Sequence, residues 1–179
     1  MKTLLSILSL ASGLAIAQAQ NFTVSLDPTQ EANPVGGRTG SGIGNLTLTG
    51  TTLTLDITFS GLSSTFSADH IHGPAAATPS TTASVIYPLQ SITTTSDGGH
   101  AGTIVGSVNL VPLQSGGYTV AQQLSDLENG LWYVNVHTST FPGGEIRGQI
   151  LPVPEPSTLA LAGLGLGGLL IWKLRRRGE

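Results

Sequence analysis

The histidines are the residues of this 179-residue chain whose types and spacing could do chemistry. His70 and His72 flank one isoleucine in Asp-His-Ile-His-Gly-Pro, and His137 ends the stretch Tyr-Val-Asn-Val-His. Alternate residues of a strand point to the same side, so His70 and His72 share a face, and His137 lies on the polar face of its own strand. Neutral imidazoles that converge from one face bind copper or zinc. These three histidines are therefore candidate metal ligands.

A second interpretation gives the same rings a structural role, in which they hydrogen-bond to backbone and loop groups and fix the turns after their strands. In the metal interpretation, Asp69 or Glu145 would hydrogen-bond to the ligands from outside. His100 lies in the stretch Asp-Gly-Gly-His-Ala-Gly. It is a weaker ligand candidate, because a glycine-rich loop does not hold its side chains in one place.

Glu145 and Arg147 are two residues apart and share a face, which predicts an ion pair or a hydrogen-bond network across neighbouring strands. The sequence shows no nucleophile elbow, no phosphate-binding loop and no carboxylate pair in a supporting context. We therefore predict that the protein is not an enzyme and has no catalytic residues.

The segments that must position these side chains have the composition of an all-β protein, rich in threonine, serine, glycine and valine. The clearest strand is 53–59, where apolar and polar residues alternate. One helix is expected after Thr119, which has Gln122 three residues on as in a capping box, and it would end at Gly130. Short strands and turns predict an antiparallel β-sandwich or a small Greek-key barrel with one short helix. The other strands are expected at 22–26, 44–49, 69–72, 84–89, 104–110, 131–138 and 145–151.

Charge is distributed unevenly along the chain. Residues 20–153 contain two basic residues and eight acidic ones, so their net charge is 2 − 8 = −6, against −3 for the whole chain. Binding to nucleic acid depends on neutralising phosphates, so we expect no nucleic acid partner. Cysteine is absent, and the stability of the domain must therefore come from packing or from a ligand.

Residues 1–19 have the features of a signal peptide. Lys2 provides a basic start, residues 4–16 are apolar, and Ala17 and Ala19 fit a signal peptidase site with cleavage before Gln20. The body of the protein is therefore expected to be exported.

The C-terminal segment has the features of a membrane span. No charge occurs from Leu159 to Trp172, and a helix over 157–174 would rise about 27 Å, close to the ~30 Å of a hydrocarbon core. A lysine and three arginines follow at 173–177. The positive-inside bias then places residues 175–179 in the cytoplasm and the body outside.

This tail resembles the PEP-CTERM sorting tail of Gram-negative bacteria in three features. These are Val153-Pro154-Glu155-Pro156, the short apolar helix and the terminal arginines. The resemblance covers 153–177. It implies that Val153, Pro154, Glu155 and Pro156 are the sorting motif, and that an exosortase-type membrane protease removes the helix, in bacteria that typically make exopolysaccharide. The alternative is a permanent anchor whose prolines only keep the chain extended before the span.

The body has a resemblance of its own. Three segments resemble the CHRD domain. They are 70–75 (His-Ile-His-Gly-Pro-Ala), 133–138 (Tyr-Val-Asn-Val-His-Thr) and 141–150 (Phe-Pro-Gly-Gly-Glu-Ile-Arg-Gly-Gln-Ile). The likeness spans about residues 22–151. It implies a β-rich module without an established catalytic activity.

The expected organisation is a signal peptide at 1–19, a CHRD-like β-domain at 20–151, a linker with the sorting motif at 152–158, a transmembrane helix at 159–174 and a basic cytoplasmic tail at 175–179. Two functions remain open. The first is a noncatalytic binding or structural module, anchored in the inner membrane before processing and then located in the envelope, at the surface or in the extracellular matrix. Its partners would be signal peptidase, the exosortase-type protease, and extracellular polysaccharide or other surface proteins. The second is an exported copper- or zinc-binding domain, with or without redox activity.

Overall fold

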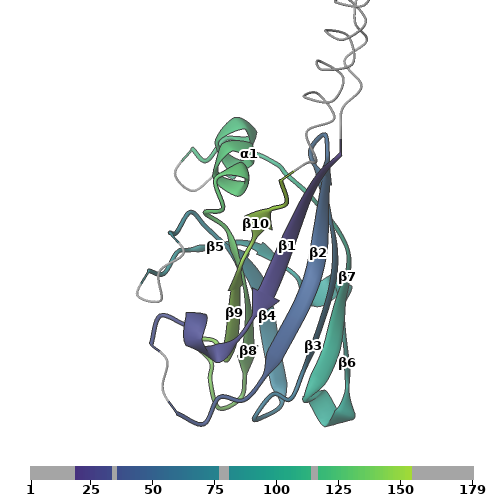
Figure 1. The fold of residues 1–179 in the computed structure, drawn as a ribbon, viewed down its shortest axis with the longest axis vertical. Coiled ribbons are helices and arrows are strands. Elements are labelled where there is room, and N and C mark those ends of the chain that lie inside the picture. Colours follow the sequence, from purple (N-terminus) through teal and green to yellow (C-terminus); the bar gives the residue numbers. More distant parts are fainter. Residues whose placement is uncertain (1–18, 34–35, 77–80, 114–116, 155–179) are drawn as a thin grey trace, which may run out of the picture.

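The computed structural model describes residues 19–33, 36–76, 81–113 and 117–154. Within these residues the strands form two sheets in which every pairing is antiparallel (Figure 1). The larger sheet has the order β10-β1-β2-β3-β7-β6, and the smaller has the order β5-β4-β8-β9. One α-helix and three short 3-10 turns connect the strands.

The six strands of the larger sheet are β1 (Gln20–Leu26), β2 (Ser41–Thr49), β3 (Thr52–Ser60), β6 (Thr93–Ser96), β7 (Ala101–Asn109) and β10 (Leu151–Pro152). The four strands of the smaller sheet are β4 (Phe66–His72), β5 (Val85–Pro88), β8 (Tyr133–Thr138) and β9 (Ile146–Gln149). The helical elements are η1 (Pro28–Gln30), η2 (Gln90–Ile92), η3 (Asp97–Gly99) and α1 (Val120–Glu128).

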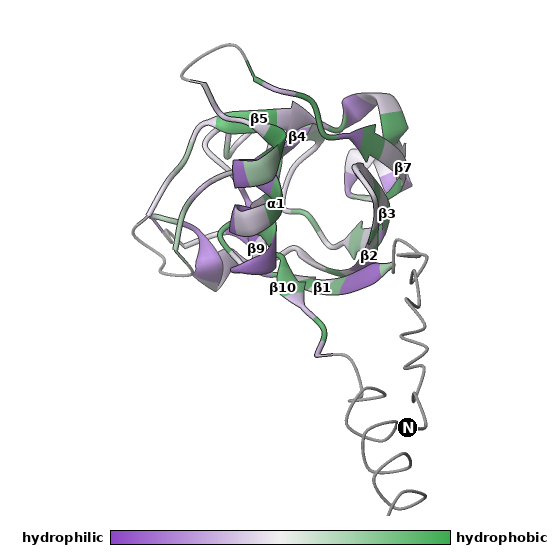
Figure 2. Ribbon diagram, turned by 90° about the horizontal axis from the view of Figure 1, so that it is seen from above, coloured by the Kyte–Doolittle hydropathy of each residue, from purple (hydrophilic) through white to green (hydrophobic). Residues whose placement is uncertain are grey.

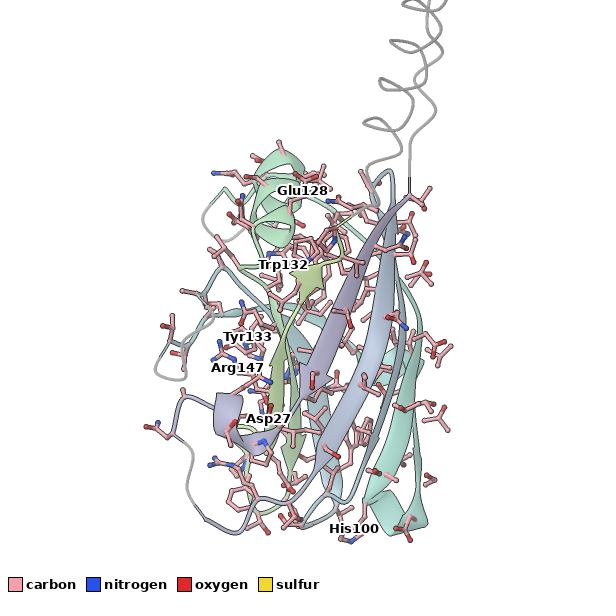
Figure 3. The ribbon with its side chains drawn as sticks, viewed as in Figure 1. Asp27, His100, Glu128, Trp132, Tyr133 and Arg147 are labelled. Atoms are coloured by element: carbon pink, nitrogen blue, oxygen red, sulfur yellow. The ribbon has the colours of Figure 1, made fainter. Side chains whose placement is uncertain are left out.

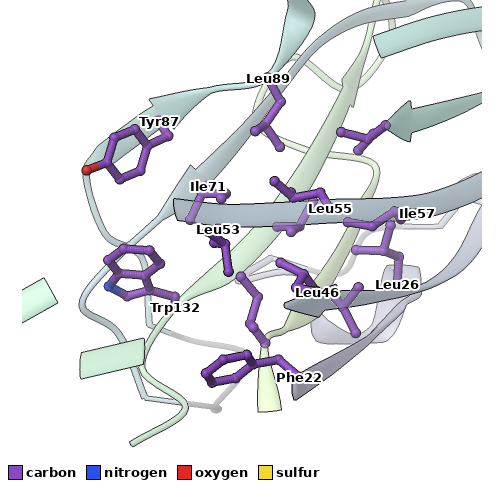
Figure 4. Close-up of a cluster of buried hydrophobic side chains, with 14 of the residues drawn as sticks. Phe22, Leu26, Leu46, Leu53, Leu55, Ile57, Ile71, Tyr87, Leu89 and Trp132 are labelled. Carbon is purple, nitrogen blue, oxygen red and sulfur yellow. The ribbon is translucent and has the colours of Figure 1, made fainter. Parts of the chain in front are cut away.

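Apolar side chains from both sheets meet in one core (Figure 4). In β3 the predicted alternation is present, since Leu53, Leu55 and Ile57 are fully buried while the residues between them are exposed. Ile71 of β4 and Val134 of β8 belong to the same core from the opposite sheet. Burying each such side chain contributes roughly 1.5–3 kcal/mol. Figure 2, viewed from above, shows the two sheets curving around this core. The core thereby decides which face of β4 and β8 points away from it.

Trp132 occupies one end of the core and fixes where β4 ends. The indole is fully buried, and its Nε1 donates a hydrogen bond to the Tyr118 hydroxyl at 2.8 Å. Gly73 follows the last residue of β4, and a Cβ there would lie 2.5 Å from Trp132 Cδ1. A side chain at position 73 would therefore displace the indole.

The helix α1 starts with the predicted capping box. Thr119 accepts a hydrogen bond from the Gln122 backbone, and the Gln122 side chain accepts one from the Thr119 backbone. A buried glutamine attaches the helix to the smaller sheet. Tyr87 donates to Gln123 Oε1 at 2.6 Å, and Gln123 Nε2 donates to the Val111 carbonyl at 2.8 Å.

The predicted all-β class with one short helix is confirmed, and two antiparallel sheets pack around one core as in the predicted sandwich. Every predicted strand overlaps a strand of the structure. The strand β6 was not predicted, because its sequence Thr-Thr-Thr-Ser has no apolar residue that would reveal an alternation. The predicted strand 145–151 is divided, because the chain passes from the smaller sheet to the larger one at Ile150.

Several predicted segments lie outside the described residues. These are the signal peptide up to residue 18, the linker beyond Pro154, the transmembrane helix at 159–174 and the tail at 175–179. The strand β1 begins at Gln20, the residue that follows the predicted cleavage site. Within the described part of the chain, no helix is long and apolar enough to cross a membrane.

The close approach of β2 and β3 gives a test of the fold. A Cβ at Gly44 would lie 2.5 Å from the Asp56 carbonyl oxygen and 2.6 Å from Ile57 Cα, so the strands would have to separate. We expect Gly44→Ala to lower the free energy of unfolding by about 1–3 kcal/mol, the usual cost of overpacking. Gly36→Ala is the control, because no atom lies within 4 Å of a Cβ at that exposed turn. Urea denaturation measures both, and equal midpoints for the two variants would contradict the strand spacing.

Candidate metal centre

The outer face of the smaller sheet is polar, as the alternation predicts, but it is also buried. Every residue of β8 is buried, on the outer face as well as on the core face. The connection between β4 and β5, which contains Ala75 and Thr81, and the turn η1, which contains Gln30, reach over the outer face. Gln149 donates to the Ala75 carbonyl at 2.9 Å, Arg147 donates to the Thr81 carbonyl at 2.6 Å, and the Gln149 backbone donates to Gln30 Oε1 at 3.2 Å. Polar side chains on this face are therefore largely shielded from water.

The three predicted ligands converge on this face. The strands β4 and β8 are neighbours, and their register pairs Ala68 with His137 and His72 with Tyr133, which brings His70 and His72 beside His137. Each histidine offers one ring nitrogen, and these nitrogens all lie within 4.8 Å of one another. Two imidazoles from one strand and one from its neighbour thus surround a common point.

Backbone carbonyls orient two of the three rings. His72 Nδ1 lies 2.9 Å from the Ala83 carbonyl oxygen, and His137 Nδ1 lies 3.0 Å from the Pro142 carbonyl oxygen. A carbonyl oxygen can only accept, so both rings carry their proton on Nδ1 and present a lone pair on Nε2. His72 Nε2 is buried and has no hydrogen-bond partner among the described residues.

The third ring joins the other two through a histidine–histidine contact. His70 Nδ1 lies 3.1 Å from His137 Nε2. Metal–nitrogen bonds of 2.0–2.1 Å in a tetrahedral site place the nitrogens about 3.3–3.4 Å apart. His70 and His137 are therefore already near ligand spacing, whereas the 4.8 Å limit on the whole set is wider than that spacing.

Burial keeps these imidazoles in the neutral form that a metal needs. Desolvation lowers the pKa of His70 and of His72, and it lowers the pKa of His137 to about 4, with further lowering by the two neighbouring histidines. At neutral pH all three rings are uncharged. Each ring therefore has one protonated nitrogen and one nitrogen with a lone pair.

The carboxylates that were expected to support the ligands lie elsewhere. Asp69 is on the core face beside Ile71, where it accepts a hydrogen bond from Thr93 Oγ1, and burial raises its pKa to about 6. Glu145 accepts from the Ser63 backbone and from Thr138 Oγ1. The expectation that either carboxylate bonds to the histidines is wrong, since backbone carbonyls take that place.

Glu145 and Arg147 were predicted to form an ion pair or a hydrogen-bond network across neighbouring strands, and in the structure each hydrogen-bonds to other groups. Both side chains are buried, and each has its own partners. The Arg147 guanidinium carbon lies 3.5 Å from the centroid of the Tyr133 ring. The His72 ring also stacks on Tyr133, nearly parallel to it, at a centroid distance of 4.9 Å. Figure 3 shows Tyr133 and Arg147 side by side on this face. This stack holds His72 in place and was not predicted.

His100, the fourth histidine, is not part of the cluster. Its Nδ1 lies 2.6 Å from the Leu62 carbonyl oxygen, next to η3. Figure 3 shows it at a different end of the molecule from Tyr133 and Arg147. Its role is to fix a turn, and it provides a matched histidine that lies outside the candidate site.

Glu31 is a buried carboxyl beside the site that sequence reasoning missed. Only 3% of it is exposed, and its Oε1 has no hydrogen-bond partner among the described residues. Burial raises the pKa of Glu31 to about 7, although Arg38, Arg147 and a hydrogen bond from Asn135 act in the opposite direction. A single glutamate in a polar loop has no sequence signal for burial.

Gly144 connects this carboxyl to the histidines. A Cβ at Gly144 would lie 2.5 Å from both Glu31 Oε1 and Asn135 Oδ1, and its φ of 122° disfavours other residues. Gly144 belongs to the same loop as Pro142, whose carbonyl orients His137. The loop that positions a candidate ligand is therefore packed tightly against Glu31.

Comparison with protein-family models identifies the body of the chain. The model described as the CHRD domain matches residues 22–150, which is more than half of the chain. The chain belongs to the CHRD domain family. The histidine cluster, the Tyr133 stack and Gly144 all lie within its CHRD domain.

A second family model, described as the PEP-CTERM protein-sorting motif, matches residues 152–177. It implies export and membrane-anchored sorting in Gram-negative bacteria, with processing by an exosortase-type membrane protease. Of the four predicted motif residues, Val153 and Pro154 are described and exposed, whereas Glu155 and Pro156 lie outside the described residues. No curated protein and no solved structure matches the chain.

The buried Glu31 predicts a dependence of stability on pH. The pKa of Glu31 is raised from 4.5 to about 7 on folding, so the folded state holds the proton more tightly than the unfolded chain. The contribution of Glu31 to the free energy of unfolding is therefore fully present below pH 4.5 and is lost as the pH rises through about 7. Glu31→Gln removes this loss, which amounts to about 3 kcal/mol at most.

Urea denaturation at pH 5 and pH 8 gives the free energy of unfolding of wild type and of Glu31→Gln. Subtracting one from the other at each pH cancels the contribution of Asp69, which is the same in both proteins. Glu128→Gln on the exposed surface of α1 is the control. A Glu31→Gln variant with the same pH dependence as wild type would show that Glu31 is ionised at little cost.

Proposed function

We propose that this CHRD domain protein is an exported, noncatalytic binding module of the cell envelope or extracellular matrix that binds one copper or zinc ion through His70, His72 and His137. The two functions left open by the sequence are compatible, and the geometry favours the metal-binding one. The decisive observation is the buried, unpartnered Nε2 of His72, in a cluster where one ring nitrogen from each of three histidines lies within 4.8 Å of the others. A buried lone pair without a donor costs free energy, and a bound ion would remove that cost.

The surroundings of the cluster support a ligand role. Metal-binding histidines commonly donate their second ring N–H to a carbonyl or a carboxylate, which fixes the tautomer and the orientation of the ring. His72 and His137 both do so, through Ala83 and Pro142. The same two bonds also support the structural interpretation for His72 and His137, because they connect these rings to the loops beside them.

The donor set indicates the class of metal. Three imidazole nitrogens suit zinc and copper, and the general order of stability places copper(II) above zinc. Three protein ligands leave one position of a four-coordinate ion for a further ligand.

The noncatalytic part of the proposal rests on the hydrogen bonds of the rings. Among the described residues, the cluster nitrogens bond to carbonyl oxygens, to each other and to Gln90. A carboxylate that acts as general base at the cluster would have to lie within hydrogen-bond reach of the reacting group. The nearby carboxylates, Asp69 and Glu145, are engaged with other partners.

Metal analysis tests the site directly. We expect the full chain, purified in detergent, to bind one copper or zinc ion, and His72→Ala, His70→Ala or His137→Ala to lose stoichiometric binding, because two imidazoles hold an ion far more weakly than three. His100→Ala is the matched control and should bind as wild type does. Elemental analysis after dialysis gives the stoichiometry. Equal binding by His72→Ala and wild type, or no bound ion in any of them, would reject the proposal.

The exported destination has its own test. We expect Glu155→Ala to impair removal of the C-terminal helix. The protein would then lose its signal peptide but keep its C-terminal tail, and it would stay in the membrane fraction. Immunoblots of membrane and extracellular fractions from the host bacterium follow the size and location of the protein. Glu128→Ala, which changes an exposed carboxylate of the domain, should be processed normally. Normal release of the Glu155→Ala protein would contradict recognition of this motif by the processing protease.

A further inference from the structure

We infer that metal loading at this site requires His70 to exchange one neutral tautomer for the other, and that Gln90 is the positioning residue that sets the balance between them. This inference rests on the proposed function for the loading step. The tautomer itself follows from hydrogen bonds in the metal-free chain, and it can be tested without a metal.

The position of each proton follows from one fixed acceptor. The Pro142 carbonyl oxygen can only accept, so the His137 proton is on Nδ1, at 3.0 Å. The His137 Nε2 then has a lone pair and must accept in its 3.1 Å contact with His70 Nδ1. His70 must therefore donate from Nδ1. Its proton sits on the nitrogen that faces His137.

This arrangement opposes metal binding. A ligand nitrogen needs a free lone pair, and the facing nitrogen of His70 is occupied by a proton that also engages the lone pair of His137. For His70 to bind, the Nδ1 proton leaves to water and another proton from water arrives at Nε2, so the ring stays neutral and no net proton is released. His70 is only partly buried, so water can exchange with it.

Gln90 is the group that faces the other nitrogen of His70. Its amide nitrogen lies 3.5 Å from His70 Nε2, and Gln90 itself is exposed, at the start of η2. An amide offers an N–H in one orientation and a carbonyl oxygen after a half-turn. The first orientation faces the lone pair of the metal-free tautomer, and the second accepts from Nε2–H of the ligand tautomer. Position 90 thus determines which tautomer of His70 has a hydrogen-bond partner at Nε2, and a glutamine there keeps both tautomers accessible.

A carboxylate at position 90 would accept only. It would favour the Nε2–H tautomer and so release Nδ1 as a ligand, in the way that carboxylates outside a metal site raise the affinity of ligand histidines. An aliphatic residue would form no hydrogen bond with His70 Nε2. The hydrogen bond from His70 Nδ1 to His137 would then keep the proton on Nδ1. The side chain at position 90 should therefore change metal affinity without touching the metal.

The experiment compares wild type with Gln90→Glu and Gln90→Leu. Ser91→Asp is the matched control, since it adds the same charge at the next exposed position, for which no contact with His70 is present. Long-range ¹H–¹⁵N NMR spectra of the full chain in detergent assign the tautomer of His70, first without metal and then with zinc. Competition with a chromophoric chelator measures the zinc affinity of each protein.

We expect metal-free wild type to have His70 protonated at Nδ1, and Gln90→Glu to move the proton to Nε2. Zinc should move it to Nε2 in both, with an affinity about tenfold higher for Gln90→Glu than for wild type and Ser91→Asp, and lower for Gln90→Leu. Metal-free wild type with His70 protonated at Nε2, or equal affinities for Gln90→Glu and Ser91→Asp, would overturn the inference.

The two proposals fail in different ways. If no variant binds zinc, the metal-binding function is wrong, and the spectra of the metal-free proteins still decide whether Gln90 controls the tautomer. If zinc binds at the histidines while Gln90→Glu leaves the metal-free tautomer unchanged, the metal site stands and the role of Gln90 is wrong.

Discussion

The burial of β8 on both faces is the constraint on which the rest of the structure depends. Its inner residues, among them Val134 and Val136, belong to the core shared with the six-stranded sheet. Its outer residues are Tyr133, Asn135 and His137, which are polar and yet buried. A buried polar group needs a hydrogen-bond partner, so the loops that cover this face must supply one for each. The candidate site is a product of that requirement.

The way the loops meet this requirement gives the histidines their chemistry. Ala83 and Pro142 offer backbone carbonyls, which accept a proton and cannot give one. Each carbonyl therefore fixes a proton on one nitrogen of a ring and a lone pair on the other. A serine or an amide in the same position would leave the tautomer undetermined. The stacking of His72, Tyr133 and Arg147 then restricts the ring that has the unpartnered nitrogen.

Much of the fold is visible in the sequence because it depends on local periodicity. The alternation of 53–59 identifies a strand and its core face, and the His-Ile-His spacing places two rings on the opposite face. The same alternation puts Asp69 on the core side with Ile71, and this argues from the sequence itself against Asp69 as a support for the ligands. The short strand β6 escapes detection, because four hydroxyl-bearing residues have no apolar side to show.

What the sequence does not reveal is the part of the site made by distant or backbone groups. The carbonyls of Ala83 and Pro142 could belong to any residue type, so no motif marks them. Glu31 lies more than 100 positions before Asn135, and only the folded structure brings them together around Gly144. The membership in the CHRD family and the sorting motif were predicted from longer patterns and are confirmed by the family models. The metal site remains a proposal that the convergence of the rings supports.

The strand β10 determines how the domain takes up mechanical load. It joins the larger sheet through two residue pairs with β1, Phe22 with Pro152 and Thr23 with Leu151, and one further bond from the Val153 backbone to the Asn21 carbonyl at 2.9 Å. While the chain is held by its C-terminal tail, a pull on the body acts first on these few bonds. The strand that precedes β10 along the chain is β9 of the smaller sheet, which carries Arg147. Tension on the tether would therefore peel β10 from the sheet before it reached the buried polar face.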